Sequence, residues 1–219
     1  MKKRLIAGVM MLLLPGPACW TAEARPAQKV IDRIVARVDD DIILLSDLRE
    51  LGEYQQLVEG KSESDAQLLD RLIDQWIVRK EAETARFPLP ADADVERSLE
   101  RWKKSFATPE DYEERRKQAG LSEAEVRQIV QMQVYLNNYL DSRFRPLIHV
   151  DEKAIEEFYN TRVVPRAKAR GQAPPSLEAA SDYIQEALIQ QGIDEQADRW
   201  LKESRARLQI KKFLDEGGK

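Results

Sequence analysis

Few residues of this chain have the types and spacing that catalysis needs. Among its 219 residues there is one histidine, His149, and one cysteine, Cys19. A Ser–His–Asp site or a histidine-based metal centre would need partners that are poorly supplied here, and the sequence has no glycine-rich loop that could cradle a phosphate. Carboxylates are plentiful, but nothing in their spacing singles out an acid–base pair. We predict a protein without catalytic residues, bound metal or cofactor.

Three consecutive aspartates, residues 39–41, could ligate a cation or form an exposed turn. No further ligands follow at the spacing of a calcium loop. Residues 34–38 before the aspartates alternate in polarity, and residues 42–45 after them form a short apolar run. Because short acidic side chains favour tight turns, we interpret the aspartates as the tip of a β-hairpin.

Five aromatic residues of the central helices are candidates for a peptide-binding surface. They could be ordinary core residues, or they could line a groove for extended apolar or aromatic peptides, since aromatic rings give a large contact area at little entropic cost. Only an exposed and contiguous patch would separate the two interpretations. The five residues are Trp102, Phe106, Tyr112, Tyr135 and Tyr139.

The N-terminus is typical of a cleavable secretory signal. Residues 2–4 are basic, residues 5–14 are apolar, and an A-x-A site at residues 22–24 predicts cleavage before Arg25. The apolar run is shorter than the ~20 residues of a membrane span. Lipid attachment at Cys19 is disfavoured because Gly16 stands where such sites usually have a branched aliphatic side chain. We expect an exported, soluble protein of the cell envelope without cysteine.

Charge argues against a nucleic-acid partner. Removal of residues 1–24 takes the formal net charge from −4 to about −6. The charged residues are interspersed along the helices, whereas nucleic-acid binding calls for a concentrated cationic patch.

A series of amphipathic helices is predicted after the hairpin. The first is expected to be capped by Ser46 and to end at Gly60. The next carries an apolar stripe of leucine, isoleucine and tryptophan residues between positions 68 and 77. Thr108 before a proline and a capping box at residues 122–125 predict two further helix starts. The helices that follow the stripe are expected at residues 95–106, 109–119, 123–144 and 152–159.

The C-terminal part is predicted to return to the hairpin. Residues 164–175 are rich in proline and are expected to form a loop. Two helices, residues 177–191 and 193–205, are predicted to be separated at Gly192. Residues 208–214, LQIKKFL, read as a strand, which needs a partner for its backbone groups and should pair with the N-terminal hairpin. The predicted fold is mainly α with a small β element.

These segments resemble the SurA-type periplasmic chaperone family. VIDRIVARVDDDIILLSDL (residues 30–48) is similar to the opening segment of that family, and LLDRLIDQWIVRKEA (residues 68–82) is similar to its second helix. Residues 120–127 resemble the start of its long helix, and residues 182–201 with LQIKKFL resemble its terminal helices and closing strand. The order and spacing of these motifs cover nearly the whole chain after the signal.

The resemblance implies a domain layout and also shows a departure from the family. Residues 1–24 would be the signal peptide, residues 25–160 the helical chaperone domain and residues 176–219 the C-terminal part that packs back on it. Parvulin-type prolyl isomerase domains usually lie between these two parts. Here residues 161–175 leave only a linker, whereas a folded domain takes ~50 residues or more. Isomerase activity is therefore not carried over.

The function that the resemblance implies is an ATP-independent periplasmic holdase, with unfolded outer-membrane proteins as its clients. An alternative is an envelope assembly subunit that docks to one dedicated folded partner. A degenerate isomerase is disfavoured because the chain has no room for that domain. The sequence leaves open whether the protein forms a homodimer by exchanging its terminal strand.

Overall fold

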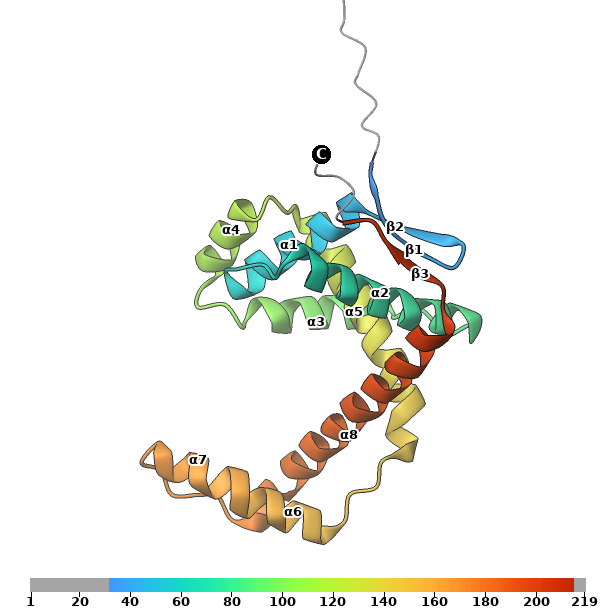
Figure 1. Cartoon of the computed structure of the whole chain (residues 1–219). Helices are drawn as coiled ribbons and strands as arrows, with labels where there is room; N and C mark the ends of the chain where they lie inside the picture. Colours follow the sequence, from blue (N-terminus) through green and yellow to red (C-terminus); the bar gives the residue numbers. More distant parts are fainter. Residues whose placement is uncertain (1–31, 215–219) are drawn as a thin grey trace, which may run out of the picture. The chain divides into compact units, whose positions relative to one another are not determined.

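The computed structural model describes residues 32–214, and this part of the chain begins with the predicted hairpin (Figure 1). Strand β1 (Ile34–Val38) pairs antiparallel with β2 (Asp41–Leu44). Asp39 sits in the turn with φ 51°, a left-handed conformation that short acidic side chains tolerate. The predicted signal peptide and Cys19 lie outside the described residues.

The predicted return of the C-terminal strand to the hairpin is confirmed. Strand β3 (Ile210–Lys212) pairs antiparallel with β1, so that Ala36 is opposite Lys212 and Val38 is opposite Ile210. The three strands lie in the order β2-β1-β3, with β1 in the centre. The prediction of a mainly helical fold that joins its two ends through a small antiparallel sheet is therefore correct.

Eight α-helices of the described chain surround or extend from this sheet. The predicted caps are present: the Thr108 hydroxyl accepts a hydrogen bond from the Asp111 backbone N–H at 3.1 Å, and Ser122 and Glu125 form a capping box. The helices are α1 (Leu45–Glu59), α2 (Asp65–Thr84), α3 (Asp92–Lys103), α4 (Pro109–Gln118), α5 (Glu123–Phe144), α6 (Glu152–Phe158), α7 (Val164–Ala169) and α8 (Leu177–Arg207).

The start of α1 differs from the prediction. The helix begins at Leu45, directly after β2, so Ser46 lies inside the first turn and does not cap it. The Asp47 carboxylate takes that role and accepts a hydrogen bond from the Leu44 backbone N–H at 2.8 Å.

The core runs from the sheet through α2 to α5 and α8. The predicted stripe of α2 is confirmed, because Leu68, Leu69, Ile73, Trp76 and Ile77 are all buried. They pack against the inner face of the sheet, which contributes Val35, Val38 and Ile43. Further along α2, Val78 and Ala82 meet α5. Phe144 at the end of α5 packs against Ile193 and Ala197 of α8.

The predicted loop at residues 164–175 is wrong for its first half. A π-helical segment, η2 (Tyr159–Val163), continues α6 into α7, and only residues 170–176 leave the helix. Pro165 removes one backbone donor, and its ring would clash with the carbonyl of Thr161 in a regular α-helix. The wider π turn immediately before α7 accommodates the proline, which is the physical reason the helix continues.

The predicted helix break at Gly192 is also wrong. Residues 177–207 form one helix, and Gly192 lies in its middle. A methyl group on Gly192 would lie 2.9 Å from both Cδ1 and Cγ2 of Ile148. The glycine therefore allows the chain after α5 to pass close to α8, which is a packing role and not a stop signal.

We predict that Gly192→Ala destabilises the protein although alanine is the better helix former. The propensity gain of about 1 kcal/mol is outweighed by overpacking against Ile148, which costs about 1–3 kcal/mol. In an Ile148→Ala background the added methyl group fits, and Gly192→Ala should then raise stability. Urea unfolding followed by circular dichroism measures the four free energies of the cycle. A substitution that stabilises both backgrounds would contradict the close contact.

Candidate functional site: an apolar groove between β2, α1, α2 and α5

A groove with mainly apolar walls lies beside the outer strand β2. It encloses about 380 Å³ and is lined by four elements. From β2 come Ile42 and Ile43, from α1 Asp47, Glu50, Leu51 and Tyr54, from α2 Leu72, Gln75, Trp76 and Arg79, and from α5 Gln128, Ile129, Met132, Gln133 and Leu136.

Helical periodicity explains why these residues meet. Each helix contributes positions about one turn apart, such as Leu51 and Tyr54 on α1 or Ile129, Met132 and Leu136 on α5. In β2 the side chains alternate, so Ile43 enters the core while Ile42 points away from it and remains 51% exposed. The groove is thus the edge of the core, where three helical stripes and one strand leave apolar surface uncovered.

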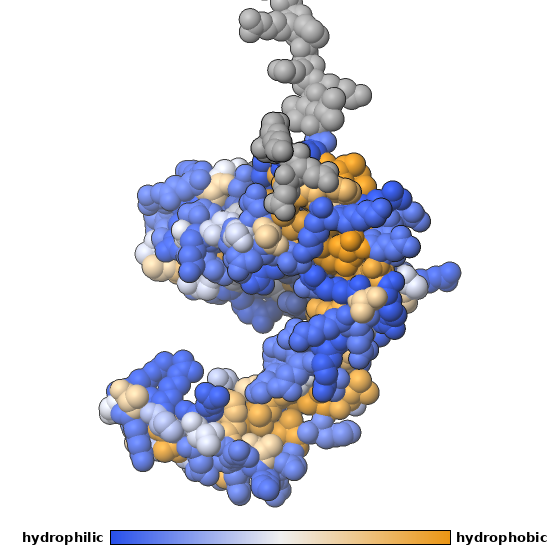
Figure 2. All heavy atoms as spheres, in the orientation of Figure 1, coloured by the Kyte–Doolittle hydropathy of each residue, from blue (hydrophilic) through white to orange (hydrophobic). Residues whose placement is uncertain are grey.

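The rim of the groove exposes two large apolar side chains. Ile42 stands on the strand side and Met132, which is 39% exposed, stands on α5. Methionine is flexible and polarisable and adapts to ligands of different shape. Figure 2 shows one face of the molecule, on which apolar side chains gather both over the sheet region and over the part formed by α6 and α8. Uncovered apolar side chains of this kind mark a place where another apolar group can bind.

A hydrogen bond between α1 and α5 fixes one end of the groove. The Tyr54 hydroxyl donates to the Gln133 side-chain oxygen at 3.1 Å. Burial raises the pKa of Tyr54, and its ring stacks on Trp102 at a centroid distance of 5.9 Å. The tyrosine therefore stays protonated and holds the two helices at a fixed spacing.

The α1 side of the rim is acidic. Burial together with the charges of Asp47, Glu125 and Glu53 raises the pKa of Glu50. Of these carboxylates, Asp47 and Glu50 of α1 line the groove, as does Arg79 of α2. A ligand with basic residues beside its apolar ones would find complementary charge here.

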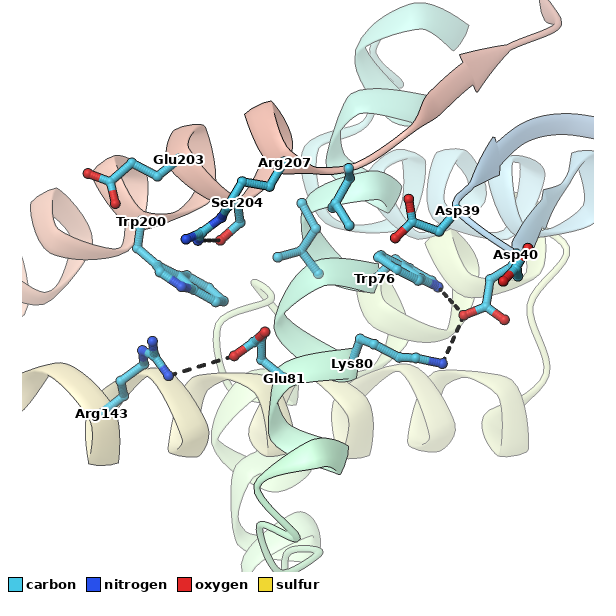
Figure 3. Close-up of a pocket in the computed structure, with 13 residues that line it drawn as sticks. Asp39, Asp40, Trp76, Lys80, Glu81, Arg143, Trp200, Glu203, Ser204 and Arg207 are labelled. Carbon is cyan, nitrogen blue, oxygen red and sulfur yellow. Dashed lines mark hydrogen bonds and ion pairs between the residues drawn. The ribbon is translucent and has the colours of Figure 1, made fainter.

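A second, polar cleft lies where the hairpin turn meets α2, α5 and α8 (Figure 3). It encloses about 780 Å³, and the Trp76 and Trp200 side chains lie among charged residues on its walls. Asp41 accepts hydrogen bonds from the Lys80 ammonium at 2.9 Å and from the Trp76 indole N–H at 3.2 Å. On the other side Arg143 lies 4.9 Å from the centre of the Trp200 ring and 3.9 Å from Glu81.

The charges of the polar cleft are largely used inside the protein. The hydrogen bond from Lys80 outweighs desolvation and lowers the pKa of Asp41, so the carboxylate stays ionised. Arg143 also donates to the Tyr139 hydroxyl at 2.9 Å. These contacts hold the hairpin turn and α5 against α2. We therefore regard the apolar groove as the candidate site and the polar cleft as a junction of the fold.

The five aromatic residues predicted to bind peptide do not form one surface. Trp102, Phe106 and Tyr112 cluster edge to face on α3, α4 and the segment between them, with ring centroids 5.1–5.8 Å apart. Tyr135 and Tyr139 belong to a different cluster, in which Phe87 contacts both rings.

Burial favours the core interpretation for three of the five. Tyr112, Tyr135 and Tyr139 are at most 5% exposed, so an extended peptide could not reach their rings in this conformation. Trp102 and Phe106 are half-buried, and client contact by them stays a prediction. Replacement of Tyr135 would therefore disturb the core that it shares with Val78, Ala82 and Tyr139.

Sequence reasoning missed Ile42 and Met132. The available signal was their position: an apolar residue at an outward position of a predicted hairpin strand, and a methionine one turn from Ile129 on the predicted long helix. His149 is exposed, and no group of metal-ligating side chains occurs among residues 32–214.

No protein-family model matches the chain, and no curated protein is significantly similar to it. Within the described residues, no helix is both long and apolar enough to cross a bilayer.

We predict that Tyr135→Ala lowers the free energy of unfolding by about 3 kcal/mol, because truncation of a buried aromatic side chain leaves a cavity. At the size of this protein the melting temperature should fall by about 6–12 °C. Tyr183→Ala is the matched control, since that side chain is 67% exposed and should change stability by less than about 0.5 kcal/mol. If the two substitutions lowered the melting temperature equally, Tyr135 would not be a core residue.

The raised pKa of Glu50 predicts a pH-dependent effect of Glu50→Gln. The ordinary pKa of a glutamate is 4.5, and the folded state raises it for Glu50. Between the two pKa values the folded state binds a proton more tightly than the unfolded state does. Stability is therefore lost as pH rises through this range. Glutamine should therefore stabilise the protein at pH 7 by less than about 1 kcal/mol, because Glu50 is only partly desolvated and solvent still screens its charge. The gain should vanish below pH ~4, and urea titrations across this range measure it. A gain that grows at low pH would contradict the assignment.

Proposed function

We propose that the protein is a periplasmic, ATP-independent holdase that binds unfolded polypeptides, outer-membrane proteins among them, without prolyl isomerase activity. The observation that carries the proposal is the apolar groove, whose rim exposes Ile42 and Met132. A holdase needs apolar surface that is reachable from solvent, because unfolded clients are recognised by the side chains that their own folding will later bury.

The dimensions of the groove favour short apolar segments over whole folded surfaces. A volume of about 380 Å³ is at the lower end of small-molecule pockets and holds a few side chains. Full burial of one leucine or phenylalanine side chain is worth about 1.5–3 kcal/mol. Contacts of this size give weak and reversible binding at each segment, and such binding allows release without an energy source.

Extended segments of membrane β-barrels fit this groove in pattern. Their strands alternate apolar and polar residues and carry aromatic girdles near the membrane surfaces. In an extended chain, every second side chain points to the same face at a spacing of about 6.6 Å. One face of such a segment could place its apolar side chains in the groove while the other stays in water. The acidic rim near Glu50 would favour segments with neighbouring basic residues.

The arrangement of the chain ends gives further support. The motifs that resemble the SurA-type family include the opening segment and the closing strand, and in this fold they form adjacent strands, β1 and β3. Residues 161–175, where the family usually carries isomerase domains, form part of η2, α7 and a short turn.

We predict that Ile42→Thr combined with Met132→Gln weakens client binding at least about tenfold without loss of fold. Each change removes an exposed apolar contact worth about 1 kcal/mol and leaves the core untouched. The assay is light scattering during dilution of a urea-unfolded outer-membrane β-barrel, with and without the protein. A second, unrelated barrel tests whether the activity is general.

The matched control is Val58→Thr combined with Leu89→Gln. These side chains are 38% and 73% exposed but do not line the groove, and in both variants an aliphatic side chain becomes threonine and a larger apolar one becomes glutamine. Near-stoichiometric suppression by the wild type and the control, but not by the groove variant, supports the proposal. Equal loss in both variants would show non-specific apolar contact. No suppression of either barrel by the wild type would favour the alternative, a dedicated assembly subunit with one folded partner.

A further inference from the structure

The charges of the described chain are segregated in one place. Residues 32–214 carry 29 basic and 36 acidic side chains, yet residues 158–177 carry four basic side chains and no acidic one. The rest of the described chain therefore has a net charge of −11. The four residues are Arg162, Arg166, Lys168 and Arg170, which we call the basic tip.

The basic tip lies at the end of α8 that is remote from the sheet. It occupies η2, α7 and the first residue after α7, and α8 then leads back towards β3 (Figure 1). At 1.5 Å per residue the 31 residues of α8 span about 46 Å. A surface that contacts the basic tip would therefore not cover the groove beside β2.

The four side chains are available to a partner. All are exposed, and within residues 32–214 none of them forms an ion pair. Arg162, Arg166 and Arg170 recur every four residues along the segment formed by η2, α7 and the residue after it. Most other arginines of the helices, in contrast, pair with carboxylates, as Arg127 does with Asp92 at 2.9 Å.

The segment that carries the basic tip has a defined conformation. The Tyr159 hydroxyl donates to the Pro175 carbonyl at 2.6 Å and so closes the turn between α7 and α8. After α7 the Gln172 backbone N–H donates to the Ala167 carbonyl at 3.0 Å, and Gly171 takes φ 66°. This glycine-dependent helix end gives the cations a defined backbone support.

Local helix electrostatics explain only part of the pattern. Cations in the last turn interact favourably with the C-terminal end of a helix, which accounts for Lys168 and Arg170. Arg162 lies too far from that end to benefit. The effect also gives no reason why twenty consecutive residues contain no carboxylate in a protein with an acidic excess.

We propose that the basic tip docks the protein on an anionic lipid surface. A planar anionic surface attracts the four cations and repels the acidic remainder, so the protein would approach with the basic tip first. A long nucleic acid would also have to follow the acidic surfaces beyond this short segment, including Glu152, Glu156 and Glu157 of α6. Each cation near such a surface strengthens binding about fivefold, which gives several hundredfold for four.

The proposal is independent of the groove and of holdase activity. It places an apolar binding site and a membrane contact at different ends of one molecule. A client could then be held near a bilayer while the groove remains open to the solvent.

The test is co-sedimentation of the protein, without its predicted signal peptide, with vesicles of phosphatidylcholine alone or with ~30% phosphatidylglycerol. The wild type should bind only the anionic vesicles and should dissociate as salt rises to ~0.3 M. The variant with all four tip residues changed to glutamine should bind at least about tenfold more weakly. Circular dichroism verifies that each variant retains its helices.

The matched control replaces four exposed basic residues elsewhere, Arg49, Lys61, Lys104 and Lys117, by glutamine. The net charge changes equally, and binding should remain near the wild-type level. Equal loss in both variants would overturn the proposal in favour of net charge alone. Displacement by inorganic phosphate at constant ionic strength would reassign the residues to a phosphate site. Tip-dependent self-association without lipid, measured by sedimentation velocity, would assign them to a second copy of the chain.

Discussion

The pairing of β3 with β1 is the contact on which the rest of the structure depends. The Asp39 backbone N–H donates to the Gln209 carbonyl at 3.0 Å, and its carboxylate accepts from the Gln209 N–H at 2.8 Å. Closing a chain segment of this length costs about 4–5 kcal/mol of entropy, so two hydrogen bonds would not suffice alone. Arg205 of α8 adds contacts with Asp70 and Asp74 of α2 at 2.9 and 2.6 Å. Once β3 is in place, α8 is held along α2 and α5, and the polar cleft forms at their junction.

The same closure determines which surface stays uncovered. With β3 on one side of β1, β2 becomes the outer strand on the other, and no described element covers its neighbouring apolar residues. The apolar faces of helices α1, α2 and α5 reach this edge because the same faces pack in the core. The groove is therefore a part of the core edge that no element covers. Its floor includes Trp76 and Leu136, which are themselves buried core residues.

Local signals in the sequence predicted local structure well. The aspartate turn, Thr108 before Pro109 and the capping box at Ser122 depend on contacts within a few residues, and each is present. The errors at Ser46 and Pro165 are local as well: α1 begins before the expected cap, and a π turn lies directly before the proline. The error at Gly192 has the opposite origin, because the close approach of Ile148, a residue distant in the chain, decides it. The candidate binding surface was the least predictable part. Aromatic content pointed to Tyr135 and Tyr139, but their burial depends on Phe87, a residue some fifty positions away in the chain.

Charge pairing separates the parts of the surface that maintain the fold from those that are free to bind. Arg127 joins α3 to α5 through Asp92 and Glu96, and Arg145 joins the end of α5 to Glu186 of α8. Such exposed pairs add little stability individually, but they fix the spacing between helices where the apolar core is thin. Groups that the fold leaves without a partner then carry more information about function than the paired majority. By this criterion the basic tip and the uncovered apolar rim beside β2 stand out, because neither contributes to the closure that holds the protein together.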